Sequence, residues 1–118
     1  MIGNLLVGLV ALIHVYIVVL EMALWDTPRG RKAFGTTPAF SRDSRVLAAN
    51  QGLYNAFLVA GLVWGLIPGW GGGEAVKLFF LGCVVIAGVF GALTVSVRIL
   101  LVQTVPAAIA LLAVLFLG

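Results

Sequence analysis

The residues of this 118-residue chain that could do chemistry are few, and most of them lie inside apolar stretches. His14 and Glu21 are seven positions apart in the first apolar stretch, which places them two helical turns apart on one helix face. An ionisable side chain in a hydrophobic helix is costly and normally faces protein or water instead of lipid. We therefore expect both side chains to face other helices.

Depth along the helices predicts which polar side chains meet. At about 1.5 Å per residue, Glu21 lies about 6 Å inside the end of its helix. Asn50 lies about 7 Å inside the start of the next helix, and Gln51 follows it directly. Glu21 is therefore expected to face Asn50 or Gln51.

The remaining polar groups extend this cluster. His14 lies about 16 Å deep and is expected to face Tyr54 or Asn55, which lie at a similar depth. Arg98 and Gln103 occur where the third apolar stretch ends and the fourth begins, at the same end of the helices. The side chains expected to line a ligand-binding pocket are His14, Glu21, Asn50, Gln51, Tyr54, Asn55, Arg98 and Gln103.

Two interpretations of this cluster stay open. The amides could serve only as hydrogen bonds between helices, whereas a carboxylate is not required for that role and so favours a pocket. A zinc site needs three or four ligands, which one His and one Glu on a face do not supply. No serine lies at the depth of His14, so a Ser-His-Asp triad has no candidate. We expect no metal and no cofactor, and no catalytic residue is assigned.

The elements that position these residues are membrane-spanning helices. Apolar residues make up 63% of the chain and charged residues 9%, whereas soluble domains carry about 25% charged residues. This composition excludes a soluble enzyme, a disulfide scaffold and a nucleic-acid-binding module. A span needs about 20 apolar residues, so the chain holds at most four. The prediction is an all-α antiparallel four-helix bundle in the lipid bilayer, forming one domain over residues 1–118, with spans at about 2–25, 46–67, 75–95 and 99–117.

The fourth span contains a proline. Starting the helix near residue 99 gives it enough length, and Pro106 then lies inside it and frees the carbonyl of Val102. Gln103 or Thr104 is expected to satisfy that carbonyl.

Small residues in the second and third spans favour close helix packing. They recur four apart at Gly61 and Gly65, and again at Gly88 and Ala92. Because four helices offer limited interior for both pairs, one pair is expected to pack against a second subunit in a homo-oligomer.

The polar stretch at 26–45 indicates the orientation. It carries five of the seven Lys and Arg residues, and Arg98 adds a sixth on the same side, against Lys77 alone on the other. The positive-inside rule places this loop in the cytoplasm and both termini outside the bacterial inner membrane. Its bases, together with Phe34 and Phe40, also suit anionic lipid headgroups as partners.

These residues also resemble a known family. The run Asn50-Gln51-Gly52-Leu53-Tyr54-Asn55, preceded by His14, Glu21 and Trp25 and followed by Gln103, is similar to the small bacterial membrane proteins of domain-of-unknown-function family thirteen hundred and four. This resemblance implies a four-span inner-membrane protein and carries no established activity. A looser architectural similarity is to the MAPEG membrane enzymes, although their Arg, Asn and Glu spacing in the second helix is not matched here.

Three functions follow as alternatives. The first is binding of a small or lipophilic ligand in the cytoplasm-facing polar pocket, without catalysis. The second is a MAPEG-like enzyme acting on a lipophilic substrate, and the third is a structural or partner-binding membrane protein. The first two predict stabilisation by a ligand, and only the second predicts turnover.

The orientation can be tested with introduced cysteines, in a background where Cys83 is replaced by Ala. Thr37→Cys should be shielded from an impermeant thiol reagent in intact cells, because its segment is expected in the cytoplasm. Gly72→Cys should be labelled from outside. The reverse labelling pattern would contradict the orientation and leave the four spans in place.

Overall fold

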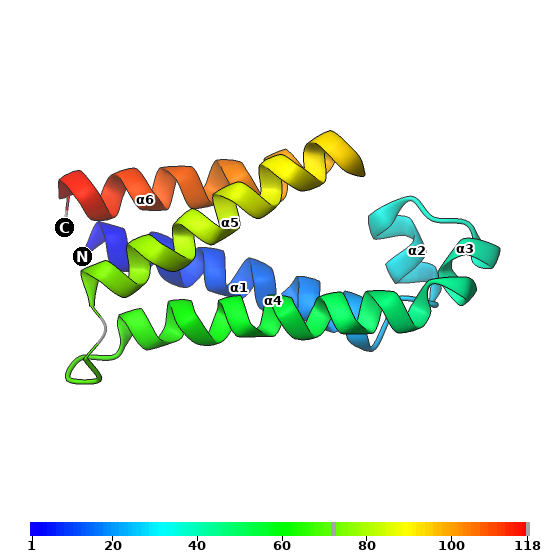
Figure 1. Ribbon diagram of the computed structural model, residues 1–118, viewed down its shortest axis with the longest axis horizontal. Coiled ribbons are helices and arrows are strands. Elements are labelled where there is room, and N and C mark those ends of the chain that lie inside the picture. The colour runs from blue at the N-terminus through cyan, green and yellow to red at the C-terminus, as the bar shows by residue number, and fades with distance from the viewer. Residues whose placement is uncertain (72, 118) are drawn as a thin grey trace. The chain divides into compact units, whose positions relative to one another are not determined.

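The computed structural model describes residues 1–71 and 73–117, so the labelling position Gly72 lies outside the described residues. Within them the chain forms helices and no strands. Four helices are long and apolar enough to cross a membrane. They are α1 (Ile2–Met22), α4 (Arg45–Leu66), α5 (Glu74–Thr94) and the π-helical segment η1 (Leu100–Thr104) continued by α6 (Val105–Leu117) (Figure 1). The expected all-α class with four spans is confirmed, and the chain is a multi-pass membrane protein.

The polar stretch expected as a loop contains two short helices, α2 (Pro28–Phe34) and α3 (Pro38–Asp43). Each begins at a Thr-Pro pair, in which proline is the first residue of the helix and threonine caps it. The Thr27 hydroxyl accepts from the amide of Gly30 at 3.3 Å, and the Thr37 hydroxyl accepts from the amide of Phe40 at 3.1 Å. Gly35, with φ of 68°, ends α2 in the left-handed region.

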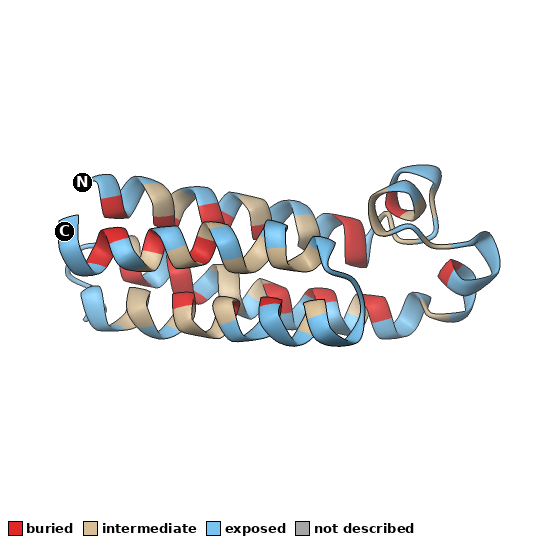
Figure 2. Cartoon of the chain, turned by 90° about the horizontal axis from the view of Figure 1, so that it is seen from above, coloured by how far each residue is buried: buried red, intermediate tan, exposed pale blue. Residues whose placement is uncertain are grey.

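The chain divides into two compact units, residues 14–57 and residues 1–13 with 58–118. The larger unit is itself a bundle of four helices, made of the first half of α1, the second half of α4, α5 and the η1–α6 helix. Its buried positions recur along one side of each helix (Figure 2). Its core consists of Val7, Val10, Ala11, Leu62, Leu81, Val84, Ala107, Ala110 and Val114.

Glycines provide the close contacts of the larger unit. A Cβ at Gly61 would collide with the ring of Phe80, and one at Gly88 would collide with Thr104. Gly65 likewise has α5 directly against it. These small residues are therefore occupied by packing inside the chain, so they do not supply a free face for a second subunit. The homo-oligomer stays a prediction without that support.

The fourth span begins with a π-helical segment instead of an α-helix kinked at its proline. In η1 the amide of Val105 donates to the carbonyl of Leu100, five residues earlier. Pro106, which has no amide hydrogen, follows at the second position of α6. The role expected for Thr104 is wrong, because its hydroxyl donates to the carbonyl of Val85 at 3.1 Å. That bond ties η1 to α5.

The packing predicts that replacement by alanine destabilises the protein at one glycine of α5 and not at another. Gly88→Ala should lower the free energy of unfolding by about 1–3 kcal/mol, because its Cβ has no room beside Thr104. Gly82→Ala is the matched control, because its Cβ would meet nothing within 4 Å. Thermal unfolding in detergent measures both variants. Equal midpoints for the two would contradict the packing of α5 against η1.

Candidate functional site: a buried carboxyl and amide in residues 14–57

Buried polar side chains gather in the unit formed by residues 14–57. This unit contains the second half of α1, the helices α2 and α3, and the first half of α4. It holds all the buried polar side chains found among the described residues, which are His14, Glu21, Ser41 and Asn55. Ser41 belongs to the short helices, where its hydroxyl lies 2.6 Å from that of Thr36. The other three lie in membrane-spanning helices.

A hydrogen bond between Glu21 and Asn55 joins α1 to α4. The Nδ2 of Asn55 donates to Oε1 of Glu21 at 2.6 Å, and the two residues are 5% and 7% exposed. Gly52 makes this distance possible, because a Cβ there would press against Met22 and Glu21. The two helices therefore approach closely one turn before Asn55, and the approach brings the amide to the carboxyl.

The pairing expected for Glu21 is wrong. Asn50 and Gln51 are both exposed, and Asn55 takes the place predicted for them. The buried face of α4 follows Ala48, Gly52 and Asn55, at spacings of four and three residues. Asn50 lies about 200° away from Ala48 around the helix and so cannot share that face. The two small residues that mark the face were the sequence feature that could have identified Asn55.

The depth estimate failed for a second reason. It assumed that the end of α1 lies level with the start of α4. Glu21 is one residue from the end of α1 at Met22, whereas Asn55 lies ten residues, about 15 Å, inside α4, so α4 extends well beyond the end of α1. Trp25 lies in the turn that follows α1. Its indole nitrogen donates to the hydroxyl of Ser44 at 3.0 Å, and its ring centroid lies 4.9 Å from that of Phe34.

His14 and Tyr54 lie in different environments. His14 is fully buried, two turns from Glu21 on α1, which agrees with the expected shared face. Its pairing with Asn55 or Tyr54 stays a prediction. Tyr54 is 61% exposed, and its ring packs edge-on against Phe57 with centroids 5.8 Å apart.

Arg98 and Gln103 belong to the larger unit, and their place in the expected pocket stays a prediction. Arg98 lies between α5 and η1 and is exposed, with its backbone amide donating to the Ser96 hydroxyl at 3.2 Å. Gln103 lies in η1 and is half-buried beside Gly88.

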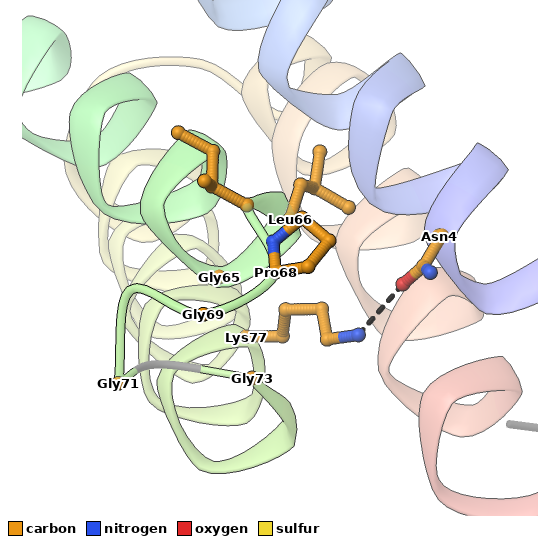
Figure 3. Close-up of a pocket in the computed structure, with 9 residues that line it drawn as sticks. Asn4, Gly65, Leu66, Pro68, Gly69, Gly71, Gly73 and Lys77 are labelled. Carbon is orange, nitrogen blue, oxygen red and sulfur yellow. Dashed lines mark hydrogen bonds between the residues drawn. The ribbon is translucent and has the colours of Figure 1, made fainter.

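A second polar contact, at the other end of α1, was not predicted. The ammonium of Lys77 donates to Oδ1 of Asn4 at 2.6 Å and borders a depression of about 380 Å³ (Figure 3). The sequence does show Lys77 as the lone cation opposite the basic segment, but nothing in the spacing indicates its partner.

The fold and these contacts define an all-α, multi-pass membrane protein with polar side chains buried between its spans. The chain belongs to the family described as Protein of unknown function (DUF1304), whose profile matches residues 8–115. No curated protein and no solved structure matches it. The family resemblance is thereby confirmed, and the similarity to the MAPEG enzymes is not. Among the described residues no group of three His, Cys, Asp or Glu side chains could hold a metal ion.

The Glu21–Asn55 contact predicts different effects for two substitutions of Glu21. Glu21→Leu should lower the free energy of unfolding by about 1–3 kcal/mol, because it leaves the buried amide without a partner. Glu21→Gln should cost less, because glutamine can still accept the hydrogen bond. Chemical or thermal unfolding in detergent measures both.

A double variant is the control for this interpretation. Glu21→Leu combined with Asn55→Leu removes both partners and should recover much of the stability lost in the single variant. Additive losses in the double variant would show that the two side chains do not interact.

Proposed function

We propose that this protein binds a small ligand at the carboxyl group of Glu21, and that the ligand carries a positive charge or a hydrogen-bond donor. The supporting observation is the buried hydrogen bond of 2.6 Å from Asn55 inside a pair of membrane-spanning helices. Ionisable groups at such positions are rare because of their cost, and they commonly mark substrate, ion or proton pathways.

Glu21 has more hydrogen-bonding capacity than Asn55 uses. A carboxylate offers about four acceptor positions on its two oxygens. Among the described residues, Asn55 supplies the one hydrogen bond to this side chain. No fully buried side-chain nitrogen or oxygen in the described part of the chain lacks a partner. Oε2, which Asn55 does not contact in this hydrogen bond, is the atom to which the proposed ligand would donate.

A purely structural tie would not require this residue type. Asn and Gln also hydrogen-bond across membrane helices, where such contacts contribute about 0.6 kcal/mol on average. His14 adds a second ionisable side chain that is fully buried on the same face of α1. A carboxyl and an imidazole on one face suit a cationic ligand or one that exchanges a proton.

The ligand would reach Glu21 from the cytoplasmic side of the bacterial inner membrane, which is the side on which the 26–45 segment is expected to lie. This orientation follows from the cation bias of the sequence. The segment and Glu21 belong to the same compact unit, which supports access from that side. Phe40, which is exposed, and the neighbouring Arg42 suit contact with anionic lipid headgroups.

Native mass spectrometry of protein extracted from its own membrane in mild detergent tests the proposal. The wild-type protein should carry a small-molecule adduct, and Glu21→Gln should lose the adduct while keeping its unfolding temperature. Glu74→Gln is the matched control, because Glu74 is an exposed carboxylate at the start of α5. An adduct retained by Glu21→Gln would contradict the proposal. Absence of any adduct from wild type, with a silent Glu21→Gln, would leave the hydrogen bond as structural.

A further inference from the structure

A depression with one cationic side chain lies in the larger unit, where α4 turns back into α5. Its volume is about 380 Å³, and it is lined by Asn4, Lys77, residues 65–69, Gly71 and Gly73. The start of α1 and the end of α6 lie at this same end of the unit (Figure 1). Glu21 and Asn55 belong to the other compact unit, and the depression shares no residue with that pair.

Lys77 is held across the depression by neighbours on two helices. A Cβ at Gly65 would collide with the side chain of Lys77, so the absence of one lets the lysine stem lie against α4. The ammonium then reaches Asn4 on α1, where it donates to Oδ1 at 2.6 Å. Figure 3 shows the side chain of Lys77 extended toward Asn4 beneath the turn. The position of the positive charge is therefore set by packing as well as by the hydrogen bond.

The side-chain polar groups of the depression that the Lys77–Asn4 hydrogen bond does not use are donors. An ammonium has three N–H groups, of which Asn4 accepts one. The Nδ2 of Asn4 carries two more N–H groups, which the hydrogen bond to Lys77 does not use. No Asp or Glu lines the depression, and Glu74 in the first turn of α5 is exposed outside it. Such a set is complementary to the oxygens of an anion.

The depth of the depression identifies where that anion comes from. The spans end at Leu66 and restart at Glu74, so the intervening turn lies at the membrane surface. Trp64 and Trp70 are both exposed beside it, and the indole nitrogen of Trp64 donates to the carbonyl of Trp70 at 2.9 Å. Exposed tryptophans are typical of the headgroup level, and Lys77 lies only about 5 Å into α5.

We propose that this depression binds the phosphodiester group of an anionic phospholipid, with Lys77 Nζ and Asn4 Nδ2 as donors to its oxygens. A lining with one ammonium and no carboxylate favours a headgroup of net negative charge, such as phosphatidylglycerol. Phosphatidylcholine has the same phosphodiester but carries a choline cation, for which the lining supplies no carboxylate. The site is independent of the ligand proposed for Glu21.

Lipid retention by the full-length protein tests this site. The protein is placed in nanodiscs of equal parts phosphatidylglycerol and phosphatidylcholine, and native mass spectrometry records the lipids that stay bound after release. Wild type should retain phosphatidylglycerol preferentially. Lys77→Gln should reduce that retention about tenfold, as expected for loss of a charged hydrogen bond. Lys77→Arg should retain the lipid, because it keeps the charge.

Two controls distinguish loss of the site from unfolding of the protein and from a change in its net charge. Glutamine at position 77 can still hydrogen-bond to Asn4, so an unchanged unfolding temperature shows that the bundle is intact. Asn4→Leu keeps all seven Lys and Arg residues and should also reduce the retention, because it removes the Nδ2 donor. Unchanged retention in Lys77→Gln, or equal retention of the two lipids by wild type, would overturn the proposal. Displacement of the lipid by millimolar inorganic phosphate would assign the site to free phosphate and overturn the lipid assignment.

Discussion

Inside a bilayer the lipid tails are as apolar as leucine, so helices associate through close van der Waals contact and hydrogen bonds. In this chain several close contacts between helices lie at glycines. Gly61 receives the ring of Phe80, and Gly88 lies against Thr104. Two of the polar contacts between helices depend on the same constraint. Gly52 lies beside Glu21 and Gly65 lies beside Lys77, so each of these two ionisable side chains packs against a glycine.

Each of these two side chains forms a hydrogen bond with an asparagine, and the amide is the donor in one bond and the acceptor in the other. Asn55 donates through Nδ2 to the carboxyl of Glu21, whereas Asn4 accepts through Oδ1 from the ammonium of Lys77. An amide carries both a donor and an acceptor, so it suits a partner of either sign. The contacts differ in burial, since Glu21 is enclosed and Lys77 borders an open depression. That difference is the reason that we propose a small ligand for Glu21 and a lipid headgroup for Lys77.

Composition and length were sufficient to predict the four spans, because a water-free environment permits few structures other than apolar helices. Helical periodicity also placed His14 and Glu21 on the buried face of α1. The partner of Glu21 was missed because the depth count assumed that α1 ends level with the start of α4, whereas α4 extends well beyond the end of α1. The π-helical segment η1 could not be predicted either, since its register is set by packing against α5.

The hydrogen bond between Trp25 and Ser44 joins the two ends of the segment that carries α2 and α3. This bond holds the end of the α1 segment close to the start of α4, independently of the residues between Trp25 and Ser44. Lengthening a closed loop costs little, since each doubling of its length adds about 0.6 kcal/mol of closure entropy. Gly35 is exposed, and a side chain there would meet nothing within 4 Å. The turn at Gly35 is thus the place where a fluorescent or affinity module could be inserted while the membrane helices keep their packing.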